Sequence, residues 1–289
     1  MPDAPWTTRR LLQWTTQHFE ERHVDSPRVC AEMLLSHVLK VERLRLYMEP
    51  DRPASDAERT QYRDLVTRAG QHEPVDYLVG RAPFFGLELE VNPAVLIPRP
   101  STETLVEFVL QDARHREGNP IALADVCTGS GAVAVALAKH LPAASVVATD
   151  LSEPALEVAR RNIIEHGVAD QIDVRRGDLY APLAEARFDY LLSNPPYIRD
   201  AEWADVAPNV KDHEPTTALR SGTDGLDHLR PLIAAAADHL NPGGHALFEH
   251  AASHEDDVLA LATAAGFSNA HVLRDHERLP RVLVLTAPE

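Results

Sequence analysis

The strongest constraint on the fold is a regular succession of strand-like and helix-like segments that begins near residue 120. Short apolar runs of strand length alternate there with longer segments whose apolar residues recur at helical spacing. The expected strands are 121–126, 145–149, 172–175, 188–193, 244–248, 269–274 and 281–285, and the expected helices are 132–140, 154–166, 226–240 and 256–265. This alternation is typical of a parallel sheet covered by helices, because parallel strands need crossover connections.

The first part of the chain has helical spacing throughout and no strand-like alternation. Between Trp6 and about Gly70, apolar residues recur every three or four positions. Ser26-Pro27 has the form of a capped helix start with Pro at the first helical position, and another helix is expected to begin near Ser55. We therefore expect a small unit of three to five helices, which can serve as a partner-recognition module or as a lid.

A β-hairpin is expected to join the two parts. Residues 84–91 alternate apolar and acidic side chains, Asn92-Pro93 provides a turn, and the apolar residues 95–97 follow. Ser101 is then expected to cap the next helix. The expected organisation is a helical domain over 1–80, a hairpin linker over 81–100 and an α/β domain over 101–289.

Composition excludes several classes of protein. The chain has 28 Lys and Arg against 44 Asp and Glu, a net charge of −16, and a surface of this sign repels the phosphates of DNA. The two cysteines, Cys30 and Cys127, are far apart, and the 15 histidines form no His-Glu-x-x-His motif, so we expect neither a disulfide framework nor a metal site. With no signal-like segment and no bilayer-length apolar run, we expect a cytoplasmic monomer that does not bind membranes.

A loop of small residues follows the first strand of the α/β part. It comprises Cys127, Thr128, Gly129, Ser130 and Gly131. Such a loop lets a ligand approach the backbone closely, and Asp150, followed by Leu151, ends the next strand 19 positions after the loop. Asp150 is placed to accept hydrogen bonds from ribose hydroxyls, and Asp178 or Leu179 would lie beside an adenine. Together with Asn194, which follows the fourth expected strand, these residues predict a nucleoside site.

The nucleoside site fits two kinds of ligand. A dinucleotide is one, but the loop lacks the third glycine of the usual fingerprint, since Val133 and Ala134 stand there, and it holds no Lys or Arg for phosphate. S-adenosylmethionine is the other, because it has one nucleoside, a cationic sulfonium and no phosphate. An acidic pocket favours S-adenosylmethionine, and a nicotinamide dehydrogenase remains the weaker alternative.

The strand that ends at Ser193 leads into Asn194, Pro195, Pro196 and Tyr197. Proline has no backbone N–H, so this turn cannot extend a sheet and leaves carbonyl oxygens free to accept. A planar group that bears an NH2 can donate to the Asn194 side chain and the Pro195 carbonyl while Tyr197 packs on its flat face. The same residues fit a turn that merely ends a strand, but the nearby nucleoside loop favours a site.

The segment Ser193-Asn194-Pro195-Pro196-Tyr197 resembles the motif of amino-group methyltransferases, and wider matches resemble the release-factor glutamine methyltransferases. The matching segments are 74–80, 85–87, 96–103, 127–131, 194–197, 214–215 and 222–227. The resemblance implies a class I S-adenosylmethionine-dependent methyltransferase, with a Rossmann-like seven-stranded sheet and a small all-α N-terminal domain that helps hold the release factor. It also implies that Asn194 to Tyr197, together with Arg99, bind the glutamine of a Gly-Gly-Gln motif for methylation at N5.

The chain also departs from that family at several positions. Ser101 stands where Asp is usual, and the family's Glu-x-Gly-x-x-Gln stretch is replaced by residues 249–253. Cys127 stands where Gly is usual, which is similar to relatives that methylate a ribosomal-protein glutamine. That substrate therefore remains an alternative, DNA adenine a weaker one, and a non-catalytic module that binds the cofactor or a translation factor is the alternative from another class.

Overall fold

The computed structural model of the chain describes residues 5–116 and 120–289. The expected absence of a signal segment concerns in part residues 1–4, which lie outside the described residues. By their internal contacts the residues form two compact units, one of Met1–Arg81 with Ala207–His213 and one of Ala82–Val206 with Glu214–Glu289. Among the described residues, no helix is both long and apolar enough to cross a bilayer.

The first unit is made of helices around its own apolar core. Its helices are α1 (Thr8–Glu20), α2 (Pro27–Leu39), α3 (Arg43–Met48), α4 (Asp56–Ala69), α5 (Val75–Val79) and, from the later segment, α9 (Pro208–Lys211). Helix α4 begins as expected at Ser55, whose hydroxyl accepts from the Glu58 N–H while the Glu58 carboxylate accepts from the Ser55 N–H. The predicted cap at Ser26 is wrong: Pro27 does begin α2, but Ser26 has a left-handed backbone and makes no capping bond.

A β-hairpin of β1 (Arg81–Phe84) and β2 (Leu87–Glu90) stands at the start of the second unit, with only Arg81 of β1 counted in the first. Its turn is Phe85-Gly86, where both residues have positive φ, as two-residue hairpin turns require. The Phe85 N–H donates to the Glu103 carboxylate at 2.7 Å, which stabilises this unusual conformation. The predicted turn at Asn92-Pro93 does form, since the Val95 N–H donates to the Asn92 carbonyl at 3.1 Å, but it is not the turn of the hairpin, and residues 95–97 form no strand.

The main sheet has seven strands in the order β5-β4-β3-β6-β7-β9-β8. The strands are β3 (Ile121–Val126), β4 (Ala144–Asp150), β5 (Ile172–Arg176), β6 (Phe188–Ser193), β7 (Leu240–Glu249), β8 (His271–Arg274) and β9 (Pro280–Thr286). Strands β3 to β7 pair in parallel, and β9 runs antiparallel between β7 and β8. This is the class I methyltransferase fold that the sequence resemblance implied.

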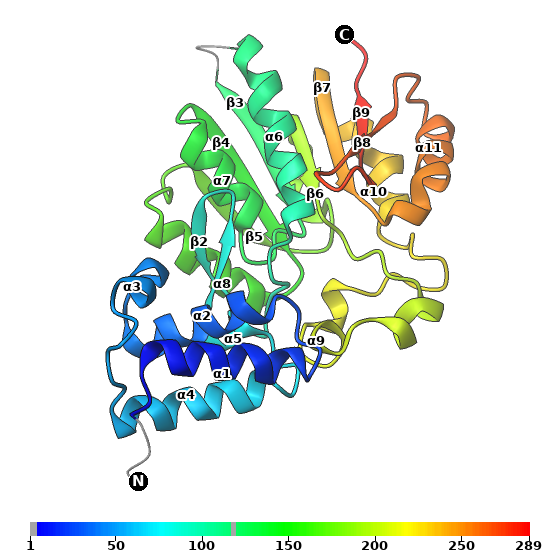
Figure 1. Cartoon of the computed structure of the whole chain (residues 1–289). Coiled ribbons are helices and arrows are strands. Elements are labelled where there is room, and N and C mark those ends of the chain that lie inside the picture. Colours follow the sequence, from blue (N-terminus) through cyan, green and yellow to red (C-terminus); the bar gives the residue numbers. More distant parts are fainter. Residues whose placement is uncertain (1–4, 117–119) are drawn as a thin grey trace. The chain divides into compact units, whose positions relative to one another are not determined.

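Helices cover both faces of this sheet (Figure 1). They are α6 (Glu103–Asp112), α7 (Ala132–His140), α8 (Glu153–Glu165), α10 (Leu229–Ala235) and α11 (Glu255–Ala264). A hydrophobic core lies on each face of the sheet, and successive strand residues point into opposite cores. Leu123 packs with α6 and α7, whereas its neighbour Ala124 packs with α10 and α11. The helix predicted over 226–240 is shorter than expected, because its last turn is a 3-10 helix and β7 already begins at Leu240.

Strand β7 starts early because it contains a bulge. Phe188 of β6 pairs with Leu240, but Tyr190 pairs with His245, so β7 advances five residues while β6 advances two. Gly244 makes the bulge possible: a Cβ there would lie about 3 Å from the carbonyl oxygens of Asn241 and Phe188. Beyond His245 the two strands stay in register as far as Phe248.

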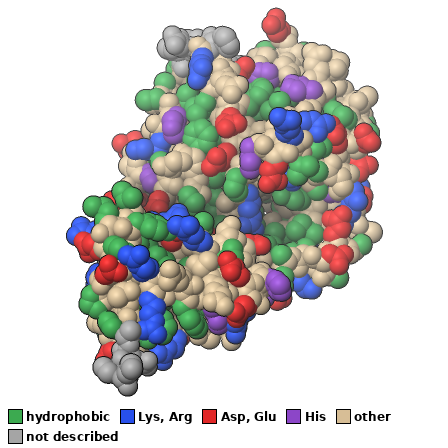
Figure 2. Space-filling view, in the orientation of Figure 1, with side chains coloured by type: hydrophobic (Ala, Val, Ile, Leu, Met, Phe, Trp, Pro, Cys, Tyr) green, Lys and Arg blue, Asp and Glu red, His purple; other side chains and the backbone are tan. Residues whose placement is uncertain are grey.

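The acidic excess is spread over the surface. On the face in Figure 2, Asp and Glu side chains lie on many parts of the chain, with Lys and Arg between them. Several of these charges are paired, for example Arg161 with Glu90 at 2.8 Å. The charge is therefore a property of the whole surface on this face and no single acidic cluster dominates it.

Candidate active site

Sheet register brings the candidate residues together. Val126 of β3 pairs with Thr149 of β4 and with Ser193 of β6, and Ser193 pairs with Phe248 of β7. The residues one step further along are Cys127, Asp150, Asn194 and Glu249. Because the strands are parallel, these four residues form a row at the carboxyl edge, where α/β proteins bind ligands.

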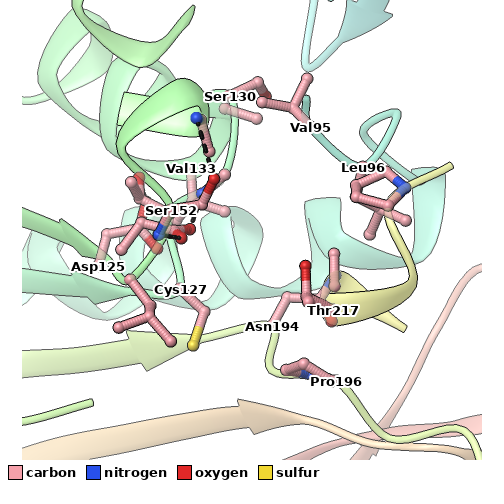
Figure 3. A pocket seen from close by; sticks show the side chains of 18 of the residues that line it. Val95, Leu96, Asp125, Cys127, Ser130, Val133, Ser152, Asn194, Pro196 and Thr217 are labelled. Atoms are coloured by element: carbon pink, nitrogen blue, oxygen red, sulfur yellow. Dashed lines mark hydrogen bonds between the residues drawn. The ribbon is translucent and has the colours of Figure 1, made fainter. Parts of the chain in front are cut away.

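A cavity of about 350 Å³ opens at this edge. Figure 3 shows Asp125, Cys127 and Ser152 on one side of it and Leu96 and Thr217 on the other, with Asn194 between them. The candidate residues that line the cavity are Cys127, Thr128, Gly129, Ser130, Asp150, Leu151, Asp178, Leu179, Asn194 and Pro196; Gly131, Pro195, Tyr197 and Arg99 are not among the lining residues. The volume lies within the range of about 300–1,000 Å³ typical of small-molecule sites.

The carboxylate of Asp150 anchors the loop that precedes α7. It accepts from the Gly129 N–H and from the Ser152 N–H, each at 2.9 Å. Burial raises the pKa of Asp150, while these backbone N–H groups act in the opposite direction. Gly131 starts α7 with φ of 80°, and a Cβ on it would lie 3.2 Å from Ala159, so the loop needs glycine there.

Asp125 is a cavity residue that the sequence analysis missed. It lies in β3, is almost fully buried, and accepts from Thr128 Oγ1 at 2.5 Å and from the Ala134 N–H at 3.2 Å. Burial raises its pKa to about 7. The signal in the sequence is a lone carboxylate in an otherwise apolar strand, which is rarely placed there without a role.

Cys127 combines a left-handed backbone, with φ of 61°, and a half-buried side chain. Burial raises the pKa of this thiol to about 12, and the nearby carboxylate of Asp150 adds to the effect. A thiol with this pKa stays protonated near neutral pH, so it is a poor nucleophile. Its position at the cavity wall fits packing against a bound ligand.

The Asn194 side chain is held in one orientation. Its Nδ2 donates to Thr102 Oγ1 at 3.0 Å, and among the described residues no donor reaches its Oδ1. The Pro195 carbonyl likewise accepts from no described group. Two oxygens are thus available to a ligand at the end of β6.

Glu249, at the end of β7, accepts hydrogen bonds from three hydroxyl groups near Asn194. It is completely buried and accepts from Thr102 Oγ1 at 2.6 Å and from Ser101 Oγ and the Tyr197 hydroxyl at 3.2 Å each. The predicted cap at Ser101 is therefore wrong, because its hydroxyl serves Glu249 and α6 has no side-chain cap. Burial raises the pKa of Glu249, while these hydroxyl donors and Arg281 act to lower it.

Arg99 lies beside the cavity and is paired with a buried acid. It forms an ion pair with Glu214, whose other oxygen accepts from the Ile97 N–H at 3.0 Å. Glu214 thereby ties the segment 94–98 to the segment 215–218, and both segments line the cavity. Thr102, Glu214 and Glu249 were missed as site residues, because their roles depend on contacts between residues more than a hundred positions apart.

The cavity suits a nucleoside with a cationic substituent better than a metal ion. Among the described residues, no group of three or more His, Cys, Asp and Glu is arranged to hold a metal. Three carboxylates, Asp125, Asp150 and Asp178, line the cavity, and among its lining residues there is no Lys or Arg to bind a phosphate. These residues fit S-adenosylmethionine and do not favour a dinucleotide.

Comparisons with known proteins identify the family of the chain. Residues 10–80 match the family model described as PrmC N-terminal domain, and residues 100–212 match the Methyltransferase small domain. The chain is 39% identical over 278 residues to the release factor glutamine methyltransferase of Geobacter sulfurreducens, which covers 96% of both chains.

Further relatives give the same result. The release factor glutamine methyltransferase of Xylella fastidiosa is 41% identical over 261 residues, which covers 90% of this chain and 94% of the relative. A crystal structure of a methyltransferase from Pyrococcus furiosus shares the fold, with a TM-score of 0.51 and 20% identity over 71% of this chain and 91% of that one. The chain belongs to the release factor glutamine methyltransferase family.

Proposed function

We propose that the protein transfers a methyl group from S-adenosylmethionine to the side-chain nitrogen N5 of the glutamine in the Gly-Gly-Gln motif of peptide chain release factors. One observation carries the proposal: Asn194 presents an unpaired oxygen at the edge of a cavity that fits the cofactor. Family membership supports the same substrate. Because release factors act on ribosomes, the proposal places the protein in the cytoplasm, where we expect it to be a monomer.

The loop and the carboxylates would hold the cofactor. Bound S-adenosylmethionine supplies a methyl group on a sulfonium, which makes the methyl electrophilic. Asp150 would accept from the ribose hydroxyls with the lone pairs that Gly129 and Ser152 leave free. Asp125, Asp150 and Asp178 give the cavity an acidic lining, which favours a cationic ligand over a neutral one. Leu151, Asp178 and Leu179 would flank the adenine.

Asn194 Oδ1 and the Pro195 carbonyl, which we call the amide clamp, would position the nucleophile. An amide nitrogen is a poor nucleophile because its lone pair is delocalised into the carbonyl. Two N–H groups held by Asn194 Oδ1 and the Pro195 carbonyl increase the electron density on that nitrogen and fix its direction. In favourable cases, alignment of this kind lowers the activation free energy by as much as about 7–11 kcal/mol. The nitrogen becomes acidic once it carries the methyl group, so its proton can leave to water after the transfer.

The substrate is tested by incubating the protein with isotopically labelled S-adenosylmethionine and a purified release factor. Mass spectrometry should locate one added methyl on the glutamine of Gly-Gly-Gln. The control is the same release factor with that glutamine replaced by alanine, which should receive no label. Label that persists on the alanine variant would show that the proposed target is wrong.

A second substrate is favoured by one specific observation. Cys127 stands at the positive-φ position where release-factor enzymes usually have glycine, a feature similar to relatives that act on a ribosomal protein. The same assay with purified ribosomal proteins separates the two candidates. A higher kcat/KM for a ribosomal protein than for the release factor would reverse our proposal.

A further inference from the structure

Behind Asn194 lies a chain of hydrogen bonds that runs in one direction. Glu249 is completely buried and accepts a hydrogen bond from the Thr102 hydroxyl at 2.6 Å. The same Thr102 oxygen accepts a hydrogen bond from Asn194 Nδ2 at 3.0 Å. Thr102 is itself only 4% exposed, although it lines the cavity, so these contacts are largely shielded from bulk water. Neither Thr102 nor Glu249 is among the residues that we have placed in contact with the glutamine.

The number of protons fixes the direction of this chain. Glu249 accepts from the hydroxyls of Ser101, Thr102 and Tyr197, so it acts as an acceptor on both oxygens and Thr102 uses its single hydroxyl proton on it. The Thr102 oxygen is then left only with lone pairs for Asn194, which must turn its NH2 toward Thr102. The amide oxygen therefore faces the other way, where it can accept from a ligand.

We propose that Glu249 and Thr102 are positioning residues that set the polarity of the Asn194 amide, and that this polarity makes the site select a glutamine amide over a glutamate carboxylate. The inference rests on the proposed function and extends it to substrate discrimination. Without the Thr102 hydroxyl, the Asn194 amide is free to rotate by half a turn. Its NH2 would then face the substrate, repel the NH2 of glutamine and donate to the carboxylate of glutamate.

Selectivity is tested by comparing two release factors that differ only in the target side chain. Their dissociation constants are measured by calorimetry with the enzyme saturated with S-adenosylhomocysteine, so that no turnover occurs. Wild-type enzyme should bind the glutamine form more tightly than the Gln→Glu form. In Thr102→Val, which keeps the shape and removes the hydroxyl, this preference should fall by about tenfold or more, as expected when one buried hydrogen bond is reversed.

Three variants serve as controls. Thr102→Ser keeps a hydroxyl and should retain the preference within about threefold. Ser101→Ala removes another hydrogen bond to Glu249 but makes no contact with Asn194, so the preference should stay as in wild type. Glu249→Gln can still accept from Thr102 through its amide oxygen and should lose less of the preference than Thr102→Val. Equal preference in Thr102→Val and wild type overturns the proposal.

A second measurement does not depend on the substrate. Neutron diffraction from deuterated wild-type crystals locates the hydroxyl deuteron of Thr102 and the two amide deuterons of Asn194. We expect the Thr102 deuteron to point at Glu249 and an Asn194 deuteron to point at Thr102. A Thr102 deuteron directed at Asn194 overturns the proposal even if the release factor is methylated, whereas absence of methylation with the expected deuterons refutes only the proposed substrate.

Discussion

The Asn194 side-chain amide carries an NH2 on one side and an oxygen on the other, so its orientation decides which of the two a ligand meets. In this protein the nitrogen donates to Thr102, which leaves the oxygen available to a ligand. The clamp therefore depends on three residues from different elements, since Asn194 follows β6, Thr102 precedes α6 and Glu249 ends β7. A change at any of the three is expected to alter how the substrate amide is bound and oriented.

Replacing Asn194 with alanine tests its role in that step. Loss of one acceptor for the amide N–H should lower kcat by about 10²–10³-fold, the range seen when a single orienting hydrogen bond to a reacting group is removed. The dissociation constant of S-adenosylmethionine, measured by calorimetry, should change by less than about threefold, since the loop and Asp150 are untouched. A variant that keeps its kcat would contradict the mechanism.

Asp125 should make cofactor binding depend on pH. Its pKa of about 7 in the free protein means that it is largely protonated at pH 6 and largely ionised at pH 8. A cationic ligand is held better by the ionised form, so the affinity should rise by up to about tenfold over that interval. Titrations at several pH values check this, and Asp125→Asn should remove most of the dependence. Affinity that falls as the pH rises would show the opposite sign.

Some of the site was predictable from single residues and some was not. The loop from Cys127 and the carboxylate of Asp150 follow strands whose ends are clear in the sequence, so their meeting at one cavity was foreseeable. Glu249 was not foreseeable as a partner of Thr102, because the two lie 147 positions apart and only the folded sheet brings them together. Local sequence patterns do not indicate which hydroxyl will donate a hydrogen bond to a buried carboxylate.

At the scale of elements, strands and helices of the α/β part were predicted best. Strand β3, strand β6 and helix α7 have the bounds expected from their apolar patterns, because buried parallel strands give unbroken apolar runs. The hairpin turn was misplaced because Asn92-Pro93 is a stronger turn signal than Phe85-Gly86. Positive φ at Phe85 is stabilised by Glu103 from another element, which a local pattern cannot reveal.

Asn162 of α8 links the hairpin to the cofactor loop. It is fully buried, accepts from the Glu90 N–H at 2.7 Å, and donates to the carbonyls of Glu90 and Ser130 at 3.0 and 2.9 Å. Asn162→Ala should lower the free energy of unfolding by about 2–4 kcal/mol, because it leaves buried backbone groups without partners. It should also weaken S-adenosylmethionine binding, because the loop at Ser130 loses its anchor.

The matched control for this variant is the neighbouring Arg161. Its exposed side chain pairs with the carboxylate of the same Glu90, a kind of contact that contributes about 0–1 kcal/mol. Arg161→Ala should therefore change the free energy of unfolding in urea by less than about 1 kcal/mol and leave cofactor binding intact. Equal destabilisation by the two substitutions would assign the effect to the hairpin contact in general and not to the buried hydrogen bonds.

At the scale of the whole molecule, the net charge of −16 governs how a protein substrate approaches. If the partner presents a basic surface, long-range attraction raises the rate of encounter, and salt screens it over about 10 Å at 0.1 M ionic strength. We expect kcat/KM for the release factor to fall several-fold between 50 and 300 mM salt, a range in which that screening becomes strong. The turnover number kcat should stay nearly constant.

A short neutral peptide that contains Gly-Gly-Gln is the control for this salt effect. It reaches the same cavity without a large charged surface, so its kcat/KM should vary much less with salt. Steady-state rates for both substrates over a salt series make the comparison. A fall of the same size for the peptide would place the effect at the cavity itself and not at the surface of the molecule.

The bulge in β7 has a consequence for how this chain tolerates changes in its length. Side chains alternate between faces along a strand, so a slip of one residue after His245 would turn Glu249 away and place another residue beside Asn194. The bulge lies before His245, where β7 already carries more residues than β6. An insertion or deletion at that end can be absorbed before the paired register begins. Changes in chain length are thus expected to be tolerated best at the end of the strands opposite the reaction, where they leave the hydrogen bonds between Glu249, Thr102 and Asn194 in place.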